Sequence, residues 1–243
     1  MLKNSCKRVG SDGCKDVDPE LRYRLIETGR SLRCGDLVLF CGRGWLSALI
    51  RFFTRSQWTH VAMVVRLPDH DETLLIEANS RGEVNDFFAG QCLAGVTLVA
   101  FHERVACYDG RVALRRRDRA LSARAAERFR RRVRQYYRRP YKNFVLSMTM
   151  DLLLGLHGRA ILPGVFCSEL VAELCRHMGW LVGSARTSRV VPAHFHETEP
   201  RAACFAHAGF GSLEWLKASD APACGTPAIV PETAVHETPL PRQ

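Results

Sequence analysis

The stretch HVAMVVRLPDHDETLLIEA (60–78) carries the pattern that decides the fold. Two apolar runs rich in β-branched residues, 60–67 and 73–78, are separated by the polar residues PDHDE. Runs of this kind around a short polar connection are typical of an antiparallel hairpin. We therefore expect two neighbouring strands here, around which the rest of the chain is arranged.

The register of this hairpin brings two titratable side chains together. With the turn centred on Pro68-Asp69, His60 on the first strand faces Glu77 on the second. Directly opposed residues of an antiparallel pair share a face, with Cβ atoms about 4.5–5.5 Å apart. A carboxylate bound to one ring nitrogen fixes the imidazole tautomer and leaves the other nitrogen free as a base. Taken alone, however, His60 also fits a strand-end histidine satisfied by a neighbour, and Glu77 an exposed strand carboxylate.

The flanking segments alternate between helices and strands. Asp18 followed by Pro19 predicts the start of a short helix, which Gly29 is expected to end. Apolar runs and helical spacing predict four further elements: a strand at 37–40, a helix at 45–54, a strand at 96–101 and a helix at 122–137.

A last helix supplies a nucleophile. In VFCSELVAELCRHMG (165–179), the apolar stripe begins at Cys167, and Gly179 is placed to end the helix. A cysteine on such a stripe is usually a core residue, but the first turn of a helix also favours a thiolate. The helix dipole contributes at most about 2 kcal/mol, or about 1.5 pKa units, whereas a His-paired thiolate needs about five. An imidazolium partner is therefore required, and His60 is the candidate.

The bulk properties favour one domain. The chain of 243 residues is 47% hydrophobic and 25% charged, enough for one substantial core. We expect a loose leader at 1–17, a catalytic domain at 18–217 and a disordered tail at 218–243, where five of the eleven prolines lie. The sequence shows neither a secretory signal nor a membrane-spanning run, so a cytoplasmic location, peripheral to membranes at most, is expected.

Ten cysteines are scattered along the chain. Without a signal peptide, this distribution favours reduced thiols over a disulfide framework. The spacings contain no CxxC pair, so zinc fits poorly, and we expect neither a metal nor a cofactor.

The positive charge is concentrated in one segment. Residues 111–139 contain thirteen arginines against Asp118 and Glu127, a net charge of +11 within a total of +10. The simple interpretation is an arginine-rich helix with a solvated face. The functional one is attraction to phosphate groups, of an anionic membrane surface or of nucleic acid, of which nucleic acid is disfavoured.

Several motifs together resemble the circularly permuted NlpC-type papain-like cysteine amidases and peptidases. This group includes bacterial and poxviral members and, more distantly, the lecithin:retinol acyltransferase relatives. The resemblance covers about residues 20–196 and rests on five stretches: GDLVLF (35–40), TRSQWTHVAMVV (54–65), LLIEA (74–78), PYKNF (140–144) and VFCSELVAEL (165–174).

The resemblance implies an α+β, permuted papain-like fold, with an antiparallel, partly barrelled sheet packed against the helix that carries the nucleophile. Carried over by position, it implies that Cys167 is the nucleophile, His60 the base and Glu77 the third polar residue, with the Cys167 backbone N–H as an oxyanion donor. It also implies that three residues lie near the cleft: Trp58, Tyr141 and Pro192.

Three functions fit these residues. The first is hydrolysis of an amide through a thioester acyl-enzyme. The second is a lipid-directed acyltransferase or (lyso)phospholipase reaction that uses the same triad at an anionic membrane surface. The third is an inactive binding protein on this fold, which an intact triad disfavours. The partner is thus an amide- or ester-containing peptide or lipid.

Overall fold

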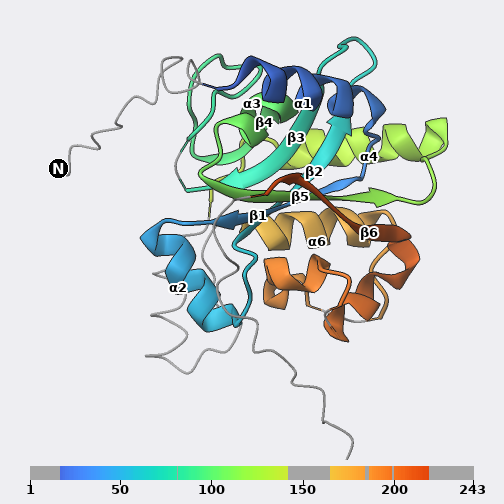
Figure 1. The fold of residues 1–243 in the computed structure, drawn as a ribbon. Helices are drawn as coiled ribbons and strands as arrows, with labels where there is room; N and C mark the ends of the chain where they lie inside the picture. Colours follow the sequence, from blue (N-terminus) through green and yellow to red (C-terminus); the bar gives the residue numbers. More distant parts are fainter. Residues whose placement is uncertain (1–16, 81, 142–164, 184–185, 199, 219–243) are drawn as a thin grey trace, which may run out of the picture.

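A computed structural model describes residues 17–80, 82–141, 165–183, 186–198 and 200–218 (Figure 1). Six strands form one antiparallel sheet in the order β4-β3-β2-β1-β5-β6. The strands are β1 (Leu37–Gly42), β2 (His60–Arg66), β3 (Thr73–Asn79), β4 (Gly95–Ala100), β5 (Gly110–Arg117) and β6 (Phe210–Lys217). The sheet is open, with β4 and β6 at its edges, so the expectation of a partly barrelled sheet is not met.

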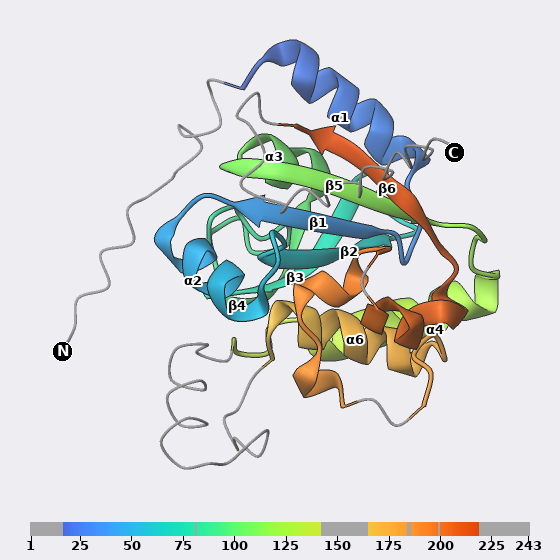
Figure 2. The same ribbon diagram turned by 60° about the horizontal axis from the view of Figure 1, so that its bottom comes forward.

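Helices cover both faces of the sheet. The α-helices are α1 (Pro19–Ser31), α2 (Trp45–Thr54), α3 (Phe101–Ala106), α4 (Ala123–Tyr136) and α6 (Cys167–His177). Three 3-10 helices follow α6: η1 (Thr187–Arg189), η2 (Pro192–Phe195) and η3 (Pro200–Ala208). Figure 2 shows the sheet as a layer between α1 and α3 on one side and α4 and α6 on the other. The coarse expectation of an α+β fold is therefore confirmed.

Alternation along the strands creates two cores. On β2, Val61, Met63 and Val65 face α4 and α6, whereas Ala62 and Val64 face α1 and α3. All five side chains are fully buried, as expected for central strands covered on both faces.

The first helix starts as predicted and ends later. The Asp18 side chain accepts a hydrogen bond from the Glu20 N–H at 3.0 Å, and Pro19 occupies the first helical position. The helix continues through Gly29 to Ser31. Gly29 is buried, and a Cβ there would lie 3.3 Å from Cδ1 of Phe101, so this glycine permits close packing of α1 against α3.

The hairpin exists, but its register is shifted by two residues. Arg66 pairs with Thr73, not with Asp71 as the expected turn requires, and the connection spans 67–72. The predicted direct opposition of His60 and Glu77 is therefore wrong. A shift of one residue would turn every side chain to the other face, whereas a shift of two keeps the face and makes the pair diagonal neighbours.

The basic segment 111–139 is not a single helix. It contains all of the sheet strand β5 except Gly110, as well as α4. Ser122 caps α4, and its hydroxyl accepts a hydrogen bond from the Ala125 N–H at 3.3 Å. The apolar stripe of α4 buries Phe129, Val133 and Tyr136.

Six of the seven described cysteines are free thiols, and Cys107 is disulfide-bonded, so the expectation of reduced thiols is wrong at that position. Within the described ranges, no helix is long and apolar enough to cross a membrane. The expected leader and tail lie outside the described residues, apart from Val17 and Ala218.

Candidate active site

Three elements bring the predicted residues together at one end of the sheet. Cys167 is the first residue of α6, His60 the first residue of β2, and Glu77 lies in β3. Ile76 and Ala78 belong to the core on the α6 side, so Glu77 between them points to the opposite face, towards α3. His60 lies at the end of β2. From this position its side chain can contact α6 on one face of the sheet and the Glu77 carboxylate on the other.

His60 bridges the other two residues. Its Nε2 lies 2.8 Å from Glu77 Oε2, and its imidazole is close enough to the Cys167 thiol for each group to shift the pKa of the other. Because Nε2 is engaged by the carboxylate, Nδ1 is the ring nitrogen left to interact with the sulfur. Phe40 packs against the ring, with centroids 5.3 Å apart.

The environment favours a thiolate–imidazolium pair. Burial by itself would raise the pKa of Cys167 and lower the pKa of His60. The attraction and hydrogen bond between the two groups outweigh burial, so the pKa of Cys167 lies below its usual value and the pKa of His60 rises to about 9. The nearby backbone N–H groups of Val61 and Ser168 also favour the charged form and lower the pKa of the thiol.

Glu77 is ionised although it is buried. Only 2% of the residue is exposed, which would raise the pKa of the carboxyl group. The nearby charge of Arg104 and the hydrogen bond with His60 reverse this effect and lower the pKa of Glu77 to about 2. Arg104 Nε lies 3.0 Å from Oε1 and 2.9 Å from Oε2 of this carboxylate.

Arg104 is a site residue that the sequence patterns above do not predict. It lies on the buried face of α3 with Phe101 and Val105, and only 4% of it is exposed. An arginine on the apolar face of a short helix is the signal in the sequence that indicates a buried partner.

The three residues expected near the cleft differ in position. Tyr141 packs edge-on against Phe166, with ring centroids 5.9 Å apart, and burial together with the charge of Cys167 raises the pKa of its phenol. Tyr141 therefore lies beside Cys167. Trp58 is 1% exposed and stacks on Trp215 at 5.6 Å, so it supports the residues leading into β2 from within the core.

Pro192 is buried at the start of η2, in the segment that follows α6. The Ser168 hydroxyl donates to the Val190 carbonyl at 2.6 Å and ties this segment to the first turn of α6. The predicted oxyanion donor, the Cys167 N–H, belongs to the same first turn.

Within the described part of the chain, no group of three or more His, Cys, Asp or Glu residues is arranged to hold a metal ion. The polar side chains assembled here are the Cys167 thiol, the His60 imidazole, the Glu77 carboxylate and, behind Glu77, the Arg104 guanidinium, a set whose chemistry is that of a thiolate beside a base.

Comparisons with known proteins establish no family. No protein-family model matches the chain, and no curated protein matches it. A solved structure with detectable similarity is the metalloprotein YiiX of Escherichia coli O157:H7, DUF1105. It shares 20% sequence identity and a TM-score of 0.43 over 60% of this chain. The matched region spans 66% of the length of YiiX.

Proposed function

We propose that the protein is a cysteine hydrolase, an amidase or peptidase of the permuted papain-like kind, that acts through a thioester acyl-enzyme. The contact of Cys167 with His60, at the start of a helix and backed by buried Glu77, carries this proposal. This arrangement lowers the pKa of the thiol and supplies a base and an orienting group for that base.

The reaction follows from the positions of these groups. The Cys167 thiolate attacks the carbonyl carbon, forming a C–S bond and an oxyanion that the Cys167 N–H stabilises. The imidazolium of His60 gives its Nδ1 proton to the leaving amine as the C–N bond breaks. Neutral His60 then takes a proton from water, which attacks the thioester and releases a carboxylic acid. The sulfur leaves as thiolate and the imidazolium is restored.

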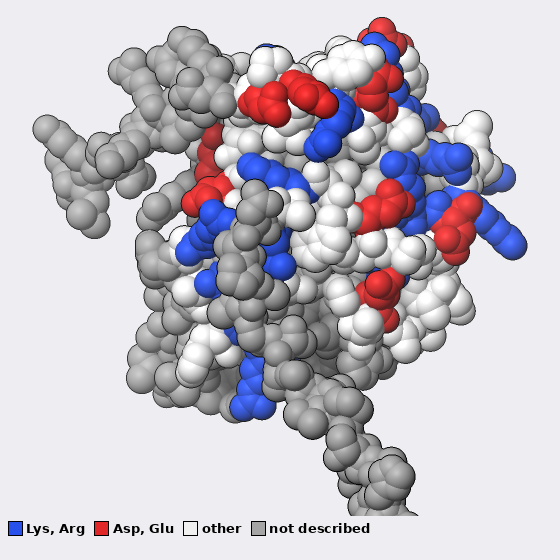
Figure 3. All heavy atoms as spheres, viewed as in Figure 1, with Lys and Arg blue, Asp and Glu red and all other residues white. Residues whose placement is uncertain are grey.

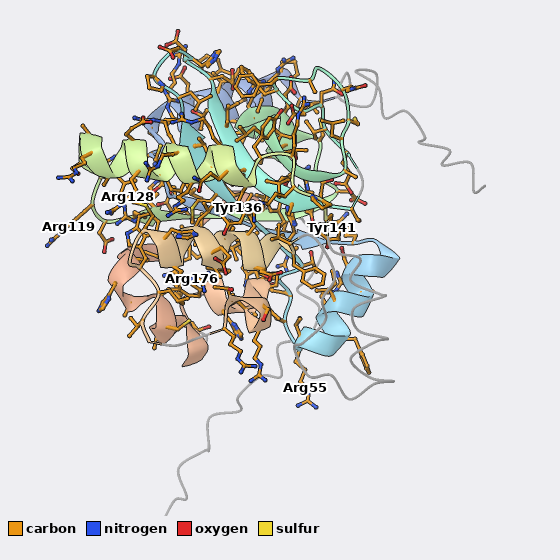
Figure 4. All side chains as sticks on the ribbon, turned by 180° about the vertical axis from the view of Figure 1, so that it is seen from behind. Arg55, Arg119, Arg128, Tyr136, Tyr141 and Arg176 are labelled. Carbon is orange, nitrogen blue, oxygen red and sulfur yellow. The ribbon has the colours of Figure 1, made fainter. Side chains whose placement is uncertain are left out.

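The same acyl-enzyme serves a second candidate, cleavage or transfer of a lipid acyl group. One observation favours it: Arg124, Arg128 and Arg131 are exposed and, at steps of four and three residues, lie on one side of α4. Figure 4 shows Arg128 on this helix. These arginines offer positive charge to an anionic lipid surface.

Trapping of the acyl group distinguishes these functions. The protein is incubated with peptide amides or with phospholipid vesicles, quenched in acid and measured by intact mass, with hydroxylamine treatment to release thioesters. We expect a hydroxylamine-sensitive adduct that maps to Cys167. It should disappear in Cys167→Ala and persist in Cys175→Ala, a matched control because Cys175 is buried in the same helix and burial raises its pKa.

An adduct from peptide amides supports the amidase, and one from phospholipid supports the lipid reaction. A protein that binds either compound without forming an adduct on Cys167 is a binding protein, and the hydrolase proposal is then wrong.

A further inference from the structure

Arg104 contacts Glu77 and not the nucleophile, yet its position makes the state of the nucleophile depend on it. Its Nε binds both oxygens of Glu77, and its guanidinium lies 5.0 Å from the ring centroids of both Phe40 and Tyr108. The outer side of the guanidinium reaches Glu83, at 3.1 Å from Oε2. The Glu83 side chain is 61% exposed, so water screens its charge, whereas Glu77 and Arg104 are both buried.

The charges of the buried groups balance only when Arg104 is counted. The thiolate of Cys167, the imidazolium of His60, the carboxylate of Glu77 and the guanidinium of Arg104 sum to zero. Without Arg104 the group would carry one net negative charge in the interior, which is costly. Uptake of one proton removes that cost, at Cys167 or at Glu77.

Either protonation would abolish the reactive arrangement. A protonated Cys167 is a poor nucleophile. A protonated Glu77 would donate its O–H to His60 Nε2, which places the ring proton on Nδ1 and leaves no lone pair to take a proton from sulfur or water. Among the described residues, the other titratable and charged groups facing this cluster are Glu83, Tyr108 and Tyr141. The pKa of Tyr108 is raised to about 12 and the pKa of Tyr141 is also raised, so both phenols stay neutral.

We propose that Arg104 is a positioning residue that holds Glu77 as a carboxylate and thereby fixes His60 with Nδ1 towards Cys167. The catalytic importance of Arg104 rests on the proposed function. The test of its effect on Glu77, His60 and Cys167 needs no substrate. α3 is then part of the active site, although none of its residues is placed to touch a substrate.

The first test is the pH dependence of Cys167 alkylation by iodoacetamide, followed by peptide mapping, in Arg104→Met. We expect the apparent pKa of Cys167 to rise by one unit or more, so that alkylation at pH values below the wild-type apparent pKa slows about 10-fold or more. The matched control is Arg115→Met: Arg115 is a buried arginine on β5 that donates to the carbonyls of Phe195, Phe210 and Gly211. This control should lower the Tm without moving the profile.

Histidine NMR gives a second readout. In the wild type at pH 10, the ring nitrogens of His60 should show a proton on Nε2. In Arg104→Met the population with the proton on Nδ1 should increase. A folded Arg104→Met protein with an unchanged alkylation profile and tautomer overturns the proposal.

A stability comparison decides the matter even if Arg104→Met does not fold. In a Glu77→Gln background, Arg104 keeps a buried charge without its main partner, so adding Arg104→Met should raise the Tm. In the wild-type background the same substitution should lower the Tm or prevent folding. If Arg104→Met lowers the Tm in both backgrounds, Arg104 contributes packing alone and the proposal is wrong. If no acyl-enzyme forms, the proposed function is wrong. The alkylation profile, the His60 tautomer and the Tm comparison still test the role of Arg104 in that case.

Discussion

Both carboxylate oxygens of Glu77 lie within hydrogen-bond distance of donor groups. Oε2 lies near His60 Nε2 and Arg104 Nε, and Oε1 lies near Arg104 Nε and, at 3.3 Å, Asn79 Nδ2. A carboxylate accepts all of these bonds, but an amide must turn its NH2 group towards one of the donors. The charge of Arg104 favours the amide oxygen on its own side, which leaves the NH2 group against His60.

Glu77→Gln is therefore expected to be severe. An NH2 group that donates to Nε2 imposes the wrong tautomer on His60 and opposes the imidazolium. We expect the turnover of any identified substrate to fall on the order of 10²- to 10⁴-fold, as when the amide replaces the carboxylate of a serine-protease triad. Glu72→Gln is the matched control, since Glu72 binds His102 at 3.0 Å outside the site. A loss below about 3-fold in Glu77→Gln would show that a neutral acceptor suffices.

The Glu77 carboxylate should also make the free energy of unfolding depend on pH in the acid range. The pKa of Glu77 is about 2 in the folded protein and about 4.3 in an unfolded chain. Because the folded value is the lower one, the stabilisation is complete above about pH 5 and is lost as the pH falls towards 2. It amounts to roughly 3 kcal/mol.

Urea unfolding of the wild type and Glu77→Gln between pH 5.5 and 2.5 measures this contribution, with Glu72→Gln again as the control. The free energy of unfolding of the wild type should fall faster with acid than that of Glu77→Gln, by up to about 1.4 kcal/mol per pH unit. Parallel curves would mean that Glu77 has an ordinary pKa in the folded state.

At the level of single elements, the arginines of the basic segment 111–139 differ between β5 and α4. The β5 arginines are largely used inside the molecule: Arg115 binds three backbone carbonyls, and Arg117 lies 4.0 Å from the Trp180 ring centroid. On the face drawn in Figure 3, Lys and Arg are interspersed with Asp and Glu. The exposed arginines of α4 are thus the part of this segment best placed for an anionic surface.

Replacement of Arg124, Arg128 and Arg131 by Gln tests that surface. These side chains are exposed, so the fold should be retained, with changes in stability within about 0.5 kcal/mol. We expect the wild type to sediment with phosphatidylserine vesicles at low salt, the triple variant to do so much less, and binding to fall at high salt. If the wild type does not bind even at low salt, α4 has a solvated face and the lipid reaction loses its support.

Helices and strands with a clear pattern of apolar residues could be predicted from the sequence. The residue-by-residue register between paired strands could not. The apolar runs of β2 and β3 predict a hairpin, but the length of its connection depends on how PDHDE folds, and the observed connection is longer. The His60–Glu77 contact survives this error because a shift of two residues keeps both side chains on the same face. Similarly, the sequence predicts that Gly29 ends α1, but Gly29 lies within this helix, where a Cβ would approach Phe101, a residue distant in sequence.

Over the whole molecule, the candidate site depends on contacts between distant segments. Cys167 and His60 are separated by more than one hundred residues, and a helix start together with a strand start suffices to nominate them. Arg104 could not be nominated in this way because its role appears only when α3 packs beside β3 and faces Glu77. The overall charge of +10 is similarly uninformative until the structure shows which arginines are buried.

The central claim is that Cys167 is a thiolate paired with His60, and the pH dependence of its alkylation tests it most directly. Wild type and His60→Ala are treated briefly with iodoacetamide between pH 4 and 10, and all ten cysteines are followed by peptide mapping under reducing conditions. In the wild type, Cys167 should be labelled first at pH 6, with an apparent pKa well below the usual value of about 8.5, and His60→Ala should move that pKa to 8.5 or above. Faster labelling of Cys41 or Cys92 at pH 6, or a profile for Cys167 that His60→Ala leaves unchanged, would contradict the account.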